Sequence, residues 1–229
     1  MARSSNKFDV YLEAGKKRTF AGAVEWPGWC RSGKDEASAL KALFDYGERY
    51  ARVLRAADLD FSPPASASDF TVAERLEGNS TTDFGAPALA PSADSQPVDE
   101  AQLQRFQELL IACWKKFDAS RRSAAGRELR KGPRGGGREI EAIVRHVIEA
   151  DRAYLGKIGA KLRINERDHP ETKLDQTRQA ILTGLAASTV GDLPAQGPRG
   201  SVYWSPRYFV RRSAWHVLDH AWEIEDRLL

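Results

Sequence analysis

Cysteine, histidine and long apolar stretches are all scarce in this chain of 229 residues. The two cysteines, Cys30 and Cys113, belong to no CxxC pair, so neither a disulfide framework nor a cysteine-based metal site is expected. No segment approaches the run of about 18 apolar residues that a membrane-spanning helix requires. The first residues also lack the apolar segment of a secretory signal. We therefore expect a cytoplasmic protein with no membrane partner.

The chain also lacks a strong excess of either positive or negative charge. The chain carries 35 basic and 32 acidic residues, for a net charge of +3, which is too weak a field to attract nucleic acid. What is present is apolar material, since 41% of the residues are hydrophobic and six are tryptophan. That content excludes a wholly disordered chain, and the length favours two domains.

The first part of the chain has the hydrophobic pattern of strands around one helix. Apolar and polar residues alternate over 8–13, a second strand is expected over 18–26 before the turn at Pro27-Gly28, and a short third strand follows at 29–31. An amphipathic helix is expected over 35–57 and a last strand over 70–76. The pattern predicts a small α+β domain over residues 1–77.

The spacing of turn residues in this domain resembles that of the HicB-like antitoxin fold. The resemblance spans about residues 7–77 and rests on Phe20, Pro27-Gly28, Gly33, Glu36-Ala37 and Leu40. It implies that this domain binds a partner chain, either another protein or a second copy. Residues 1–98 contain no histidine, so little in this half suggests catalysis.

Residues 78–98 are rich in Ser, Ala, Pro and Thr and have no apolar period, which is typical of a linker. In residues 99–229 apolar residues recur at helical spacing in four segments. These are centred on 103–117, 138–159, 171–190 and 205–229, the last beginning at the capping pair Ser205-Pro206. The predicted fold class is an α+β N-terminal domain followed by an all-α, up-and-down four-helix bundle.

Three of the four histidines lie on the second and fourth of these helices. His216 and His220 are four residues apart, so a helix places them on one face, close enough to share a metal ion. In an up-and-down bundle the second and fourth helices run parallel, and a rise of about 1.5 Å per residue puts His146 at nearly the same level. Ligand bonds of about 2 Å then require ring nitrogens about 3–4 Å apart. The alternative is that the histidines are scattered surface residues, because His216 and His220 flank the apolar stripe of their helix.

The same residues resemble the DinB/YfiT-like metalloenzyme superfamily. The resemblance covers 99–229 and rests on a helix with one His followed by Glu149 to Leu155, and on the run from Trp215 to Trp222. It implies a four-helix bundle that binds a divalent metal, most often zinc or nickel, through His146, His216 and His220. Members include transferases and isomerases that use low-molecular-weight thiols, and hydrolases. A small-molecule substrate is therefore expected.

Four further residues are candidates for supporting roles. Glu223 and Asp219 lie near the face of His216 and His220 and could orient a ligand or accept a proton, although surface ion pairs are the simpler interpretation. Arg134 and Arg199 belong to two copies of the tetrapeptide Gly-Pro-Arg-Gly, each just before a His-bearing helix. They could hold an anionic substrate or thiol cofactor, or lie in solvated loops.

The sequence is compatible with two functions of different classes. The first is a metal-dependent enzyme, a thiol-dependent S-transferase or a hydrolase. The second is a non-catalytic regulator that senses a metal or ligand and binds a protein through its N-terminal domain. The coordination of the metal discriminates between them, since an enzyme needs a ligand position open to substrate.

Overall fold

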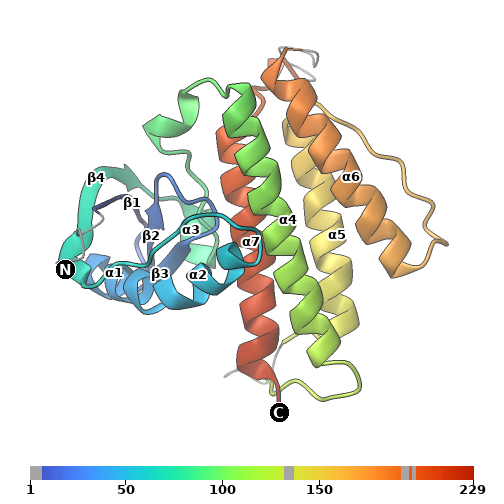
Figure 1. Cartoon of the computed structure of the whole chain (residues 1–229), viewed down its shortest axis with the longest axis horizontal. Coiled ribbons are helices and arrows are strands. Elements are labelled where there is room, and N and C mark those ends of the chain that lie inside the picture. Colours follow the sequence, from blue (N-terminus) through green and yellow to red (C-terminus); the bar gives the residue numbers. More distant parts are fainter. Residues whose placement is uncertain (1–6, 132–136, 192–195, 198–199) are drawn as a thin grey trace. The chain divides into compact units, whose positions relative to one another are not determined.

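A computed structural model of the chain describes residues 7–131, 137–191, 196–197 and 200–229. The chain divides into two compact units, Met1–Gln96 and Pro97–Leu229. The first is an α+β unit, and the described part of the second is mostly helical (Figure 1). This agrees with the predicted order of an α+β domain before a helical region. Within the described residues no helix is long and apolar enough to cross a membrane.

The first unit is built on a mixed sheet of four strands in the order β3-β2-β1-β4. The strands are β1 (Phe8–Ala14), β2 (Thr19–Ala23), β3 (Cys30–Gly33) and β4 (Phe70–Glu77). β1 pairs antiparallel with β2 and parallel with β4, and its register with β4 shifts between Val10 and Tyr11. The parallel pair needs a long connection, which the helices between β3 and β4 supply.

Two helices, α1 (Glu36–Asp45) and α2 (Gly47–Arg55), occupy the region where one continuous helix was expected. Asp35 caps α1, since its carboxylate accepts a hydrogen bond from the Ser38 amide at 2.8 Å. The helix is interrupted at Tyr46, whose backbone closes α1 and opens α2. α1 packs against β2 and β3.

Aromatic rings form the core of the first unit. Trp29 is fully buried and lies 5.3 Å from Phe8 and 5.2 Å from Phe61, measured between ring centroids, and it stacks on Tyr50 at 5.9 Å. Both polar atoms of this cluster are satisfied by backbone carbonyls. The Trp29 indole donates to Leu43 at 2.9 Å, and the Tyr50 hydroxyl donates to Pro27 at 2.8 Å.

The segment 78–98 differs from the expected structureless linker. It contains α3 (Ser80–Phe84) and a 3-10 turn, η2 (Ser92–Ser95), and up to Gln96 it belongs to the first unit. The buried carboxylate of Glu13 on β1 holds it, accepting hydrogen bonds from the Thr82 hydroxyl and from the amides of Ala88 (2.9 Å) and Leu89 (3.1 Å). A backbone bound in this way needs no apolar period of its own, which is why the composition was misleading.

The second unit contains four long helices among its described residues: α4 (Glu100–Ser123), α5 (Ile140–Lys157), α6 (Pro170–Thr189) and α7 (Pro206–Arg227). They lie side by side, with α7 against α4 and α5, and α6 against α5 and α4 (Figure 1). The Ser205-Pro206 start of α7 is confirmed, since the Ser205 hydroxyl accepts from the Tyr208 amide at 3.2 Å. α7 is buried along most of its length.

Candidate metal centre

The structure brings His146 of α5 together with His216 and His220 of α7. The Nε2 atoms of His146 and His216 are 3.2 Å apart, and one ligand nitrogen from each of the three residues lies within 4.8 Å of the others. The ring centroids are separated by 4.6–5.1 Å. One pair thus falls in the expected range of 3–4 Å, while the whole cluster is somewhat wider. We call these three residues the histidine cluster.

The histidine cluster is more buried than its position on the helical wheel suggested. His216 is 6% and His220 8% exposed, whereas His146 is half-buried. The alternative interpretation, in which His216 and His220 are surface residues beside the apolar stripe, is therefore wrong. The physical reason is that α7 has neighbours on several sides, including α4 and α5, so residues beside its apolar stripe are covered as well.

Burial also sets the protonation of two of these rings. It lowers the pKa of His146, and the neighbouring charge of His220 lowers this pKa further. The pKa of His216 lies well below its usual value, first because of burial and then because of His220 and His146. Near neutral pH both rings are therefore neutral, the form that offers a nitrogen lone pair to a metal ion.

Glu223 supports the histidine cluster from the next turn of α7. Its Oε2 lies 2.8 Å from Nδ1 of His220, and its Oε1 accepts a hydrogen bond from Arg227 at 2.7 Å. Burial alone would raise the pKa of Glu223, but the hydrogen bonds and charges of His220 and Arg227 outweigh it and lower this pKa. The carboxylate therefore stays ionised and orients His220 so that Nε2 is left for the centre.

An aromatic wall adjoins His216, and its member Tyr154 was not expected at the site. The Tyr154 ring lies 5.7 Å from the His216 ring and 5.2 Å from Trp204, which in turn contacts Tyr208 at 4.9 Å. Arg212 donates to the Tyr154 hydroxyl at 3.1 Å. The position of Tyr154, two turns after His146 on α5, was a signal that could have identified it.

The other residues that the sequence suggested for the site lie in different places. Asp219 is half-buried and is not a member of the metal-ligand cluster found among the described residues. His169 is exposed at the start of α6. Arg134 and Arg199 lie outside the described residues.

The donor set fits a divalent metal ion in most respects. Three imidazoles with converging nitrogens, one of them held by a carboxylate, form the kind of ligand set that zinc takes in sites with an open position. One feature departs from this pattern, since Nδ1 of His216 is buried and has no hydrogen-bond partner within the described part of the chain. In a fully developed site that atom would donate to an outer partner.

Comparisons with protein-family models, curated proteins and solved structures give no match to this chain. Inference about function therefore rests on the residues of the histidine cluster and their surroundings.

Proposed function

We propose that the second unit is a divalent-metal-dependent enzyme of the DinB/YfiT-like type, with α4 to α7 arranged as an up-and-down four-helix bundle. The observation that carries this proposal is the convergence of His146, His216 and His220 from two helices that are separated in sequence. Glu223 adds weight, because its hydrogen bond to His220 leaves the opposite ring nitrogen free for a ligand bond.

The three imidazoles would bind zinc or nickel. When bound there, such an ion supplies a positive charge that lowers the pKa of a water or thiol and makes the corresponding nucleophile available near neutral pH. The chain's own residues prepare this chemistry. Burial keeps His146 and His216 neutral and so competent to bind. Glu223 fixes the orientation of His220 and, because it is ionised, balances part of the charge.

The reaction that fits best is a thiol-dependent S-transfer or a hydrolysis. Tyr154 places an aromatic ring beside His216, and Trp204 contacts that ring, which suits the apolar part of a small-molecule substrate. Arg134 and Arg199 are proposed to hold the anionic group of the substrate or of a low-molecular-weight thiol cofactor.

The experiment is metal analysis of the purified protein followed by an activity screen with and without added thiols. We expect about one equivalent of zinc or nickel per chain, lost in His146→Ala, and an activity that depends on that metal. His169→Ala is the matched control, because it removes an exposed histidine of α6 outside the cluster. Equal metal content in wild type and His146→Ala would refute the site.

One observation favours a second candidate function. His216 and His220 are almost fully buried, and burial of ligands also suits a closed site that senses a metal without catalysis. In that case the first unit, which resembles a HicB-like domain, would bind a protein partner or a second copy. Cobalt substitution separates the two, since an open site changes its visible spectrum when azide or a thiol is added and a closed site does not.

A further inference from the structure

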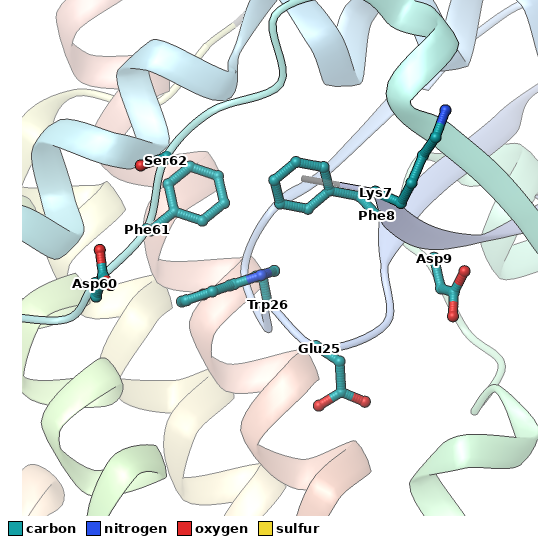
Figure 2. Close-up of a pocket in the computed structure, with 8 residues that line it drawn as sticks. All are labelled: Lys7, Phe8, Asp9, Glu25, Trp26, Asp60, Phe61 and Ser62. Atoms are coloured by element: carbon teal, nitrogen blue, oxygen red, sulfur yellow. The ribbon is translucent and has the colours of Figure 1, made fainter. Parts of the chain in front are cut away.

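Buried polar atoms that lack a hydrogen-bond partner distinguish the two units. Within the described residues, every such side-chain atom belongs to the second unit, and two of them are Nδ1 of His216 and Oγ of Ser213. The first unit has a pocket of about 500 Å³ at the start of β1, but its lining, which includes Phe8, Trp26 and Phe61, contributes no such atom (Figure 2). The unmet hydrogen bonds therefore lie in the unit that holds the histidine cluster.

Ser213 and His216 are neighbours on α7. They are three residues apart, which places them on one face of the helix with Cβ atoms about 5–6 Å from each other. An aromatic side chain in a helix also leans toward the preceding turn, and Ser213 belongs to that turn. Ser213 is 1% and His216 6% exposed, so bulk water satisfies neither polar atom.

The two ring nitrogens of His216 face different surroundings. Nε2 lies 3.2 Å from Nε2 of His146, on the side of the histidine cluster, so Nδ1 is turned away from that residue. For Nε2 to offer its lone pair to a metal ion, the ring proton must be on Nδ1. A buried N–H group of this kind requires an acceptor.

The aromatic neighbours of His216 are poor candidates for this acceptor. The indole of Trp215, whose ring centroid is 6.2 Å away, can only donate. The hydroxyl of Tyr154 is already engaged, since it accepts a hydrogen bond from Arg212 at 3.1 Å. The Ser213 hydroxyl, by contrast, is a buried acceptor that no other group uses in the described part of the chain.

We propose that Ser213 is a positioning residue of the metal site, whose hydroxyl accepts a hydrogen bond from Nδ1 of His216 and so leaves Nε2 for the ion. This inference rests on the metal site proposed above. An outer hydrogen bond of this kind fixes the tautomer and the orientation of a ligand histidine and raises its basicity. Ser213 thus serves His216 as Glu223 serves His220.

The test compares the zinc affinity of the full chain with the thermal stability of its metal-free form. Competition with a chromogenic chelator should show that Ser213→Ala binds zinc between about 10-fold and 100-fold more weakly than the wild type. The melting temperature of metal-free Ser213→Ala should stay the same or rise, because a buried hydroxyl without a partner costs free energy in the folded protein. A residue with a purely structural role would not separate the two measurements in this way.

Ser120→Ala is the matched control. Ser120 of α4 is also 1% exposed, but its hydroxyl donates to the Lys116 carbonyl at 3.0 Å and to the Glu225 carboxylate at 2.9 Å. Its loss should lower the melting temperature by about 3 °C and leave zinc affinity unchanged. Equal zinc affinity in Ser213→Ala and the wild type, or an equal loss of affinity in both serine variants, would overturn the role of Ser213. A wild-type protein that binds no zinc would instead refute the metal site itself.

Ser213→Thr tests whether the hydroxyl is the group that matters. Threonine keeps the acceptor, so zinc affinity should remain within about threefold of the wild type. A folded Ser213→Thr protein that loses as much affinity as Ser213→Ala would assign the effect to side-chain volume and contradict the hydrogen bond. If the added methyl group prevents folding, the comparison of Ser213→Ala with Ser120→Ala still decides the question.

Discussion

One buried polar group of the first unit and two of the second differ in how the surrounding residues satisfy them. In the first unit the buried carboxylate of Glu13 receives hydrogen bonds from Thr82, Ala88 and Leu89, as expected of a group whose role is structural. In the second unit Nδ1 of His216 is buried and has no hydrogen-bond partner among the residues that the structure describes, and burial raises the pKa of Asp151 to about 7. Buried polar groups that cost stability concentrate where a protein performs a function. The difference therefore supports our proposal that the functional site lies in the second unit.

Asp151 offers the largest test of this comparison. Because its pKa is raised, the folded protein keeps a proton that the unfolded chain releases, so the free energy of unfolding should fall as the pH rises from about 4 to about 7. The shift corresponds to a loss on the order of 4 kcal/mol. Asp151→Asn, which cannot ionise, should abolish this loss in urea unfolding at pH 4.5 and 7.5. Asp175→Asn, on the exposed surface of α6, should keep it.

Glu13→Leu tests the satisfied group of the first unit. The substitution leaves the amides of Ala88 and Leu89 without their acceptor, so we expect a loss of about 3 kcal/mol in the free energy of unfolding. Limited proteolysis should then cut between residues 84 and 96. Glu74→Gln is the comparison, since Glu74 accepts from Ser92 at a more exposed place and should cost less. If Glu13→Leu resisted cleavage as well as the wild type does, contacts other than those of Glu13 would hold the segment in place.

His146→Ala sharpens the comparison at the histidine cluster. His146 is half-buried, so its removal leaves a small cavity, whereas a lost ligand should weaken metal binding at least about 100-fold, the upper end of what outer-shell changes cost. Competition with a chromogenic chelator measures the affinity, and thermal unfolding of the metal-free protein measures the fold. His220→Ala should lose metal equally but destabilise more, because His220 is 8% exposed. If both variants bound metal as tightly as the wild type, the three histidines would not form a metal site. His216 and His220 would then be ordinary buried residues of the core.

Glu223→Gln should have the smallest effect. Glutamine keeps the shape but removes the charge that holds Nδ1 of His220 and the Arg227 side chain, so we expect metal affinity to fall about tenfold and the fold to be retained. Glu141→Gln, on the exposed side of α5, is the matched control. If both variants bound metal as tightly as the wild type, Glu223 would have no role at the metal site. Its only role would then be its ion pair.

Much of the architecture could be predicted because hydrophobic periodicity is local. The alternation over β1 and β4 and the helical spacing in α4 to α7 are present within each segment. Helix geometry placed His216 and His220 on one face, and the rise per residue placed His146 at their level. These three residues could be grouped without any contact being known.

The rest depends on residues that are far apart in sequence. The structured segment after β4 depends on Glu13, and the burial of His216 depends on the neighbours of α7. The contact of Arg212 with Tyr154 likewise joins two helices. No local pattern encodes such pairs, because each partner alone resembles an ordinary surface residue. The break at Tyr46 was missed for a different reason, since the apolar spacing continues through it.

The parallel pairing of β1 with β4 has a consequence for synthesis. Phe8 pairs with Phe70, and the hydrogen bonds to Glu13 come from Thr82, Ala88 and Leu89, all of which follow β4 in the chain. A nascent chain must therefore hold β1 with one open edge and an unpaired carboxylate until the end of the first unit has left the ribosome. Contacts of such long sequence separation slow folding, and an open strand edge invites pairing with other chains. Slow release of residues 70–96 from the ribosome would therefore prolong the time during which this edge is open.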